Sequence, residues 1–198
     1  MPWTLMAAIL ERREGLLTPG QPRQPSKVGA LRAVRTEYTV AGWGVGTLWT
    51  NAEGIVLAHE FAFLPGPRAD GRRSAAAATE PESPDVAEIV QSLADFLSGV
   101  DVPLARVPID LGWCSPFQRA VAEALRAVPR GEVVSYGELA ALAGHPNAHR
   151  AVGTFCARNR LMLFVPCHRV VAADGIGGYG SAGVGVKRRL LALEGIDL

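Results

Sequence analysis

Residues 135–158 read SYGELAALAGHPNAHRAVGTFCAR, and this stretch decides the fold class of the second half of the chain. Ser135 and Glu138 have the spacing of a capping box, which opens a short helix with its leucines facing inward. Glycine and proline at 144–146 form a tight turn, and Asn147 is expected to cap the next helix. Two short helices joined by a glycine-containing turn predict a helix-turn-helix. The same pattern occurs in helical hairpins that bind no DNA, and pattern alone leaves both interpretations open.

The second helix of this pair is predicted to have two different faces. Its inward face is expected to be small and apolar, with Ala148, Ala151, Val152 and Phe155. Its outward face is expected to be polar and basic, with Asn147, Arg150, Thr154 and Arg158. A basic outward face is typical of the recognition helix of a DNA-binding helix-turn-helix.

The segments around the helix pair complete a mostly helical domain, expected over residues 111–198. Before the helix pair, a capping box at Ser115–Gln118 predicts a helix that ends near residue 129. After the pair, the sequence predicts a buried extended segment at 161–165, a glycine-rich mobile wing at 174–186 and a last helix from Lys187 to Leu193. A helix-turn-helix followed by such a wing predicts a winged helix-turn-helix.

A change in residue types marks a first domain, expected over residues 36–110. Aromatic and β-branched residues from Glu37 to Phe61, interrupted by turn residues at 51–54, predict a β-hairpin with a third strand around Tyr38–Val40. The remaining predicted elements are a flexible extension at 1–35, a loop or disordered insertion at 65–84, a helix capped by Ser83 and ended by Gly99, and an extended connector at 100–112. The predicted fold class is therefore α+β, a small β-sheet domain with a flanking helix followed by a mostly helical domain.

Composition places the chain among ordinary globular proteins. Hydrophobic residues make up 48% and charged residues 20% of the sequence, and no apolar run has the length of a membrane helix. Residues 3–10 lack the basic start of a signal peptide. Three widely spaced cysteines favour a reducing compartment, the cytoplasm or the nucleus of a eukaryote, and no structural zinc. The net charge is +4 over residues 113–198 and −3 over residues 1–112, so the second half is the better candidate for contacting phosphates.

The sequence Pro-Cys-His-Arg-Val around Cys167 carries the chemistry. A cysteine after a proline at the end of an apolar run has a fixed direction, and His168 beside it can exchange a proton near neutral pH. Since a thiol with a pKa of about 8.5 must lose its proton before it attacks, His168 is expected to take that proton directly or through water. Glu194, after the last helix, is the carboxylate best placed to orient His168. Most cysteines in apolar surroundings are inert core residues, which is our interpretation of Cys114 and Cys156.

Residues 117–195 resemble the alkylguanine-DNA alkyltransferases, also called methylated-DNA–protein-cysteine methyltransferases. The matching motifs are Phe117-Gln118, PRGEVVSY at 129–136, Glu138-Leu139-Ala140, RAVG at 150–153, Asn159, PCHRV at 166–170, Gly178-Tyr179 and LLALEG at 190–195. Their joint presence in register is far more specific than any one of them. The resemblance implies DNA repair, in which an alkyl group on O6 of guanine is transferred to the protein itself.

The resemblance also implies roles for individual residues. Cys167 matches the cysteine that accepts the alkyl group, His168 the water-linked base, and Glu194 the carboxylate that orients this base. Arg150 matches the arginine that fills the gap left by the extruded guanine. Tyr136 matches the tyrosine that presses on the 3′ phosphate of the target and can donate to guanine N3. The remaining matches are the hinge asparagine Asn159, the base-pocket residues Tyr179, Ser181 and Val170, and Ala148, Ala151, Gly153 and Thr154 on the DNA-contacting helix.

These roles agree with the physics of acting on a stacked base. Flipping the base out costs a few kcal/mol, which an inserted side chain partly offsets. The family reads the minor groove, where small residues allow a helix to approach closely. Repair throughout a genome requires contacts mainly to the DNA backbone. Because a thioether is inert, we expect each molecule to react once. The protein is expected to act as a monomer and to bind duplex DNA that contains O6-alkylguanine. No cofactor, metal or membrane is expected to take part.

The sequence departs from the family at several places, and other functions stay open. The wing is slightly longer, Arg160 replaces a proline that often follows the hinge asparagine, and the N-terminal half matches only as a strand-rich domain. No cysteine precedes Cys114, so the zinc that some relatives bind in that half is not expected. One alternative is a non-catalytic binder of alkylated DNA, although relatives of that kind replace the cysteine. A second is a winged-helix regulator that binds undamaged DNA. A third is a cysteine hydrolase that turns over esters or amides.

Overall fold

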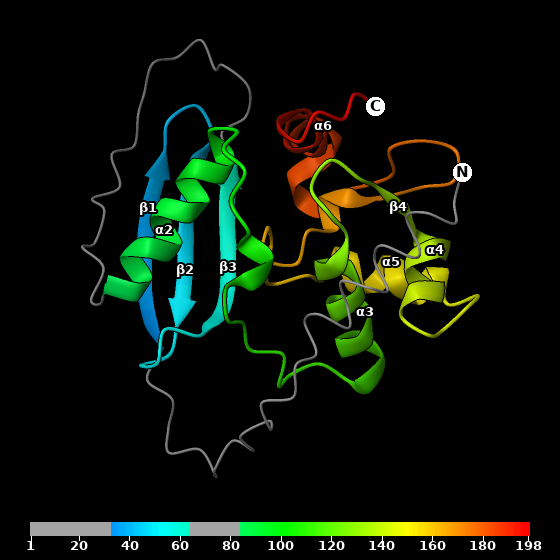
Figure 1. The fold of residues 1–198 in the computed structure, drawn as a ribbon, viewed down its shortest axis with the longest axis horizontal. Coiled ribbons are helices and arrows are strands. Elements are labelled where there is room, and N and C mark those ends of the chain that lie inside the picture. The colour runs from blue at the N-terminus through cyan, green and yellow to red at the C-terminus, as the bar shows by residue number, and fades with distance from the viewer. Residues whose placement is uncertain (1–32, 64–83) are drawn as a thin grey trace.

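Three antiparallel strands form the N-terminal part of the fold, where β-branched and aromatic residues are frequent. They are β1 (Val34–Val40), β2 (Gly44–Thr50) and β3 (Val56–Phe63), in the spatial order β1-β2-β3 (Figure 1). At the β2–β3 turn the Asn51 side chain accepts hydrogen bonds from the backbone amides of Glu53 and Ile55, at 3.1 and 2.8 Å. The predicted hairpin and third strand are confirmed.

The structure is a computed structural model, and it describes residues 33–63 and 84–198. α2 (Pro84–Leu97) lies across one face of the sheet and buries Val86, Leu93 and Phe96 (Figure 1). It ends before Gly99, whose φ of +94° suits glycine. The predictions for the N-terminal extension up to residue 32, for the loop up to residue 83 and for the Ser83 cap lie outside the described residues.

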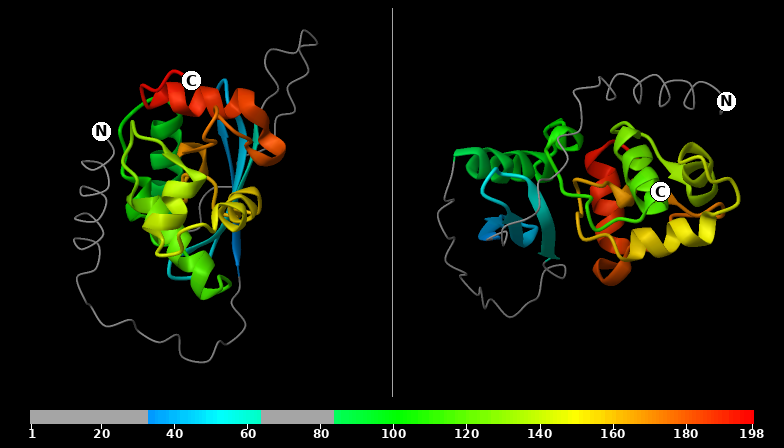
Figure 2. Two further views of the ribbon diagram at one scale, coloured as in Figure 1. Left: turned by 90° about the vertical axis from the view of Figure 1, so that its right-hand side faces the viewer. Right: turned by 90° about the horizontal axis from the view of Figure 1, so that it is seen from below.

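The C-terminal part is mostly helical and lies beside β3 (Figures 1 and 2). Both predicted capping boxes are confirmed, with Ser115 and Ser135 as the cap residues. The elements are α3 (Pro116–Ala127), α4 (Tyr136–Leu142), α5 (His149–Ala157), α6 (Gly183–Leu193), the parallel pair β4 (Val134–Ser135) and β5 (Val170–Val171), and the 3-10 helices η1 (Leu104–Arg106), η2 (Cys167–Arg169) and η3 (Gly180–Ala182). Within the described ranges, no helix combines the length and hydrophobicity needed to cross a membrane.

Two details of the α4–α5 hairpin differ from the sequence prediction. Asn147 does not cap α5. Its φ of +71° is left-handed, so it closes the turn, and Ala148 takes the cap position without a side-chain hydrogen bond. Asparagine tolerates this backbone conformation better than most residues. Ala151 is exposed rather than buried, since the inward face of α5 is formed by Val152 and Phe155.

The segments around Cys167 also differ from the prediction. Residues 161–165 form a tight buried turn, not an extended segment, because the amide of Val165 donates to the carbonyl of Leu161 at 2.8 Å and Leu163 has a φ of +72°. The last helix begins at Gly183 instead of Lys187, so residues 183–186 of the predicted wing are helical. Packing against the core outweighs the low helix propensity of two glycines there.

β3 is joined to the helical part through the buried His59. Its Nδ1 lies 2.7 Å from the carbonyl oxygen of Met162, and its backbone amide donates to the carbonyl of Arg160 at 2.8 Å. Because a carbonyl only accepts, Nδ1 carries the proton, and Nε2 accepts from the Tyr38 hydroxyl at 2.7 Å. Burial lowers the pKa of His59 to about 4, so the ring is neutral near pH 7. This contact fastens the sheet to the 161–165 turn.

Gly46→Ala should destabilise the protein, because the ring of Tyr38 covers this glycine. A Cβ at position 46 would lie 2.2 Å from Cζ of Tyr38, so the ring and its hydrogen bond to His59 would have to move. Overpacking of a buried site costs about 1–3 kcal/mol, and we expect a loss of this size in the free energy of unfolding measured with urea. Gly185→Ala on α6, where a Cβ meets open space, is the control. An equal loss in both variants would contradict the packing argument.

Candidate active site around Cys167

Asn159 holds Cys167 and the turn before it. Its Nδ2 donates to the carbonyl of Val165 at 2.8 Å and to Sγ of Cys167 at 3.2 Å, while its Oδ1 accepts from the amide of Leu161 at 2.9 Å. Cys167, the first residue of η2, is 6% exposed. One asparagine therefore connects the end of α5, the 161–165 turn and the sulfur.

His168 and Glu194 form a buried pair. Nε2 of His168 lies 2.8 Å from Oε1 of Glu194. Arg169 donates from Nε and Nη2 to the two carboxylate oxygens, each at 2.9 Å, and the amide of Gly131 donates to Oε2 at 3.3 Å. Burial favours a higher pKa for Glu194, but the hydrogen bonds and charges of His168 and Arg169 outweigh it and bring the pKa to about 2. Glu194 is therefore ionised near neutral pH.

The carboxylate determines which nitrogen of His168 carries the proton. Since a carboxylate accepts, Nε2 donates to it and Nδ1 keeps a lone pair. Nδ1 is buried and has no hydrogen-bond partner in residues 33–63 and 84–198. Burial lowers the pKa of His168 more than Glu194 raises it, so the ring is neutral. A neutral imidazole with a free Nδ1, next in sequence to Cys167, is suited to accept a proton.

Opposing effects act on the Cys167 thiol. Burial raises its pKa, whereas the hydrogen bond from Asn159 and the positive charge of Lys187 lower it. Burial is the largest of these effects, and the pKa lies above its usual value. Cys167 is therefore a thiol near neutral pH and needs a base before it can act as a nucleophile.

Two cations at this site, Lys187 and Arg169, have no counterpart among the predicted site residues. Lys187 is fully buried on α6, and its Nζ donates to the carbonyl oxygens of Val170, Ile176 and Gly178 at 2.5, 2.6 and 3.2 Å. Helical spacing could have revealed it, since Lys187, Leu190 and Glu194 share one face of the helix. Arg169 lies in the PCHRV motif, but its pairing with Glu194 was not predicted, because the two residues are 25 positions apart in sequence.

Two predicted tyrosines border the sulfur. Tyr179 is buried, and its hydroxyl interacts with the sulfur of Cys167, which lowers the pKa of that thiol. Burial, and after it the neighbouring Cys167, raises its pKa well above the usual value. Tyr136, the first residue of α4, is half-buried, and its pKa is raised by burial and by the nearby cysteines, Cys167 among them. Val170 is buried in β5 directly after η2, while Ser181 is exposed in η3.

The remaining predicted residues lie on or beside α5. Those exposed are Arg150, Ala151 and Thr154, and those partly buried are Ala148 and Gly153. Asn159 follows the end of α5 and reaches the sulfur of Cys167. The exposed face of α5 and the cysteine are therefore connected by one short segment.

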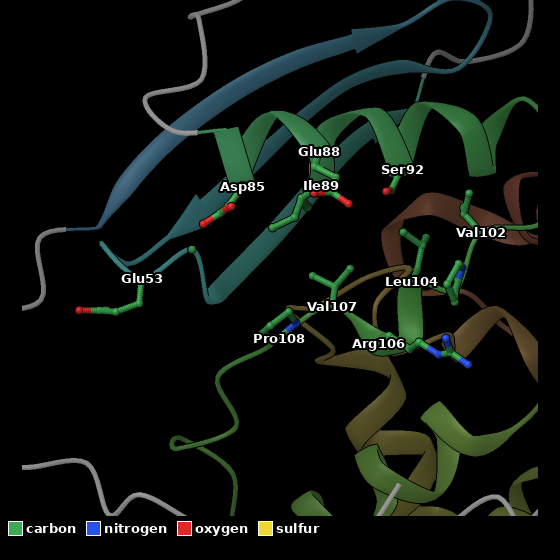
Figure 3. Close-up of a pocket in the computed structure, with 12 residues that line it drawn as sticks. Glu53, Asp85, Glu88, Ile89, Ser92, Val102, Leu104, Arg106, Val107 and Pro108 are labelled. Atoms are coloured by element: carbon green, nitrogen blue, oxygen red, sulfur yellow. The ribbon is translucent and has the colours of Figure 1, made fainter. Parts of the chain in front are cut away.

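A cavity of about 410 Å³ lies apart from this cluster, between α2, the β2–β3 turn and the connector that contains η1 (Figure 3). Its lining includes the carboxylates of Glu53, Asp85 and Glu88. None of the residues described around Cys167 lines it. Arg106 also lines the cavity (Figure 3), so the lining carries both signs of charge. The cavity is not part of the candidate active site, because the two share no residue.

Comparison with known proteins identifies the family. The family model described as 6-O-methylguanine DNA methyltransferase, DNA binding domain, matches residues 116–196. The methylated-DNA–protein-cysteine methyltransferase of Mycobacterium leprae is 42% identical over 116 residues, which are 58% of this chain and 67% of that protein. The crystal structure of Mycobacterium tuberculosis OGT in complex with DNA matches with a TM-score of 0.62 at 31% identity, over 81% of this chain and 92% of that one. The chain belongs to the methylated-DNA–protein-cysteine methyltransferase family.

Membership in this methyltransferase family confirms the resemblance seen in the sequence. The methylated-DNA–protein-cysteine methyltransferase of Methanothermobacter thermautotrophicus is 37% identical over 113 residues, which are 57% of this chain and 63% of that protein. The chain therefore spans about two thirds of the length of these curated relatives. Its mixed α/β fold, with a small antiparallel sheet and several helices, agrees with the structures of the methyltransferases.

Glu194→Gln should destabilise the protein by about 3–5 kcal/mol, because it breaks a buried ion pair. It should also change how stability depends on pH. The pKa of Glu194 is about 2 in the folded protein, below the roughly 4.3 of an unfolded chain. The wild type therefore gains stability from this group above about pH 4.3 and loses it as the pH falls toward about 2. Urea unfolding between neutral and acidic pH should show that the variant lacks this contribution.

The control for this comparison is Glu60→Gln, because Glu60 is exposed on β3. It removes the same charge without breaking a buried pair. We expect its stability to follow the wild type at each pH. If the two variants behave alike, Glu194 is not the stabilising buried charge described above.

Proposed function

We propose that this chain removes the alkyl group from O6 of guanine in duplex DNA and keeps it on Sγ of Cys167. The observation that carries the proposal is the cluster in which Asn159 contacts the sulfur and Glu194 orients His168. The names of the relatives support it, because they give methylated DNA and a cysteine of the protein as the two reacting groups.

In the proposed reaction Cys167 first loses its proton. Nδ1 of His168 accepts it through a bridging water, and Glu194 stabilises the imidazolium. The thiolate attacks the alkyl carbon, so a bond forms between sulfur and carbon while the bond between carbon and O6 breaks. The electron pair of the broken bond stays on guanine, which gains a proton from Tyr136. The proton held by His168 then replaces the one that Tyr136 has given up.

The proposed DNA-binding element is a winged helix-turn-helix, formed by residues 135–158 and the wing at 174–186. The exposed face of α5 enters the minor groove, and Arg150 fills the space of the flipped guanine. Tyr136 presses on the 3′ phosphate. The other proposed contacts are Ala148, Ala151, Gly153 and Thr154 with DNA, and Tyr179, Ser181 and Val170 with the flipped base.

The proposal also covers the organisation and the stoichiometry of the protein. Residues 36–110 form a supporting domain, and residues 111–198 form the domain that carries the reaction. The protein acts as a monomer and needs no cofactor, since the thiol itself is the acceptor. Because a thioether is chemically inert, each molecule acts once.

Intact-mass measurement tests this function directly. After mixing with a duplex that contains O6-methylguanine, the protein should gain the mass of one methylene group per molecule, and peptide mapping should place it on Cys167. Cys167→Ser should gain nothing, since a hydroxyl is a far weaker nucleophile. Repeated turnover on excess duplex, or an adduct on another residue, would show that the proposal is wrong.

Arg150→Ala should separate base extrusion from the chemical step. Extrusion costs a few kcal/mol, so we expect the rate of transfer from duplex DNA to fall by about 100-fold, while transfer from the free O6-alkylguanine base stays unchanged. Arg188→Ala, which removes the same charge from the exposed side of α6, is the control and should react normally with both. An equal loss with the free base would mean that Arg150 acts on the Cys167 site instead.

A further inference from the structure

The motif PRG at 129–131 belongs to the family resemblance but has no part in the proposed reaction. In the structure, Arg130 donates to three carbonyl oxygens at the ends of two helices. Those of Gly99 and Val100 follow α2, at 2.9 and 3.0 Å, and that of Leu193 ends α6. Carbonyl groups at a helix C-terminus have no partner within the helix, and a guanidinium group can satisfy several of them at once. Arg130 thus connects the ends of α2 and α6.

We infer that Arg130 is a positioning residue for His168 and Glu194. The inference rests on the proposed function, because it concerns the base that deprotonates Cys167. Arg130 acts on this pair by two routes, one through the end of α6 and one through α2. Neither route uses the exposed face of α5, so DNA binding is independent of it.

The first route runs through the backbone at Glu194. Arg130 holds the carbonyl of Leu193, the residue immediately before Glu194. The next residue, Gly131, donates its amide to Oε2 of Glu194 at 3.3 Å. Gly131 has a φ of +80°, and a Cβ there would lie 3.3 Å from the backbone oxygen of Glu194. Residues 130 and 131 therefore fix both the backbone and the carboxylate of Glu194.

The second route runs through the ring of Phe96, which α2 buries against the C-terminal part. The Arg130 guanidinium lies over this ring, 5.5 Å from its centroid. The same ring lies 6.0 Å from the imidazole of His168, inclined by 60°. Phe96 is 2% exposed and His168 is fully buried. Phe96 therefore contacts both the guanidinium and the imidazole, so a shift of its ring changes the packing around His168.

Arg130 acts through geometry, because its hydrogen bonds go to carbonyl oxygens and not to the carboxylate. The groups that face Glu194 are the neutral imidazole of His168 and the charged guanidinium of Arg169, both of η2. Lys187 of α6 acts electrostatically on His168. All of these groups remain when Arg130 is replaced. A change in the reaction of such a variant therefore reports the position of the pair.

The test measures the rate of alkyl transfer to Cys167 from an O6-methylguanine duplex as a function of pH, with DNA affinity measured separately. For Arg130→Met we expect transfer about tenfold slower, because His168 becomes a poorer base. The pH of half-maximal rate should rise by about half a unit, since thiolate then forms less readily. DNA affinity should stay unchanged.

Arg126→Met is a matched control from the same end of α3. Its guanidinium also donates to backbone carbonyls, those of Ala105 and Val107 in the connector. It has no hydrogen bond to Leu193 and no ring contact with Phe96 among the described residues. We expect this variant to lose stability but to keep the wild-type rate and pH profile.

Arg130→Lys keeps the inference testable if Arg130→Met does not fold. Lysine retains the charge but cannot span three carbonyl groups with a fixed planar fork, so we expect a smaller fall in rate and a shift of the profile in the same direction. A wild-type pH profile in the folded Arg130 variants, or the same shift in Arg126→Met, would overturn the inference. Wild-type protein that gains no alkyl group would instead overturn the proposed function.

Discussion

The rest of the structure depends on one buried negative charge, the carboxylate of Glu194. Taking a carboxylate out of water costs several kcal/mol unless hydrogen bonds replace its hydration. Here the donors come from segments far apart in sequence, namely His168 and Arg169 of η2 and the amide of Gly131 after α3. Satisfying this single charge orders η2, residues 128–131 and the end of α6 relative to one another. Cys167, as the first residue of η2, is ordered with them.

The same arrangement bears on how a buried sulfur could act in the proposed reaction. Burial keeps Cys167 protonated, because a thiolate inside the protein loses its hydration. Lys187 and Asn159 reduce this penalty, one with a charge and the other with a hydrogen bond, and neutral His168 offers an acceptor for the proton. A thiol at rest reacts slowly with dissolved electrophiles. Under the proposed function, in which the acceptor acts only once, such protection is required until the substrate is in place.

The sequence predicted those features whose physical cause is local. The capping boxes at Ser115 and Ser135 were correct because each joins groups three residues apart. Predictions failed where distant contacts decide the conformation. Leu163 adopts a left-handed backbone in a turn that Asn159 holds. Lys187 is buried because the carbonyl groups of β5 and of the segment after it accept its hydrogen bonds. Helical spacing could have placed Lys187 on the inward face, but the partners of both residues become visible only in the complete fold.

The N-terminal sheet and α2 contact the segment around Cys167 through His59 and Phe96, although neither residue belongs to the proposed reacting groups. His59 holds the turn before Cys167, and Phe96 packs on His168. Residues 159–169 have little regular secondary structure, so their geometry has to come from neighbouring elements. Support of this kind requires shape and packing, which many sequences can provide, whereas the reaction requires particular side chains. This difference explains why the family model matches residues 116–196 while the fold similarity to the mycobacterial structure covers 81% of the chain.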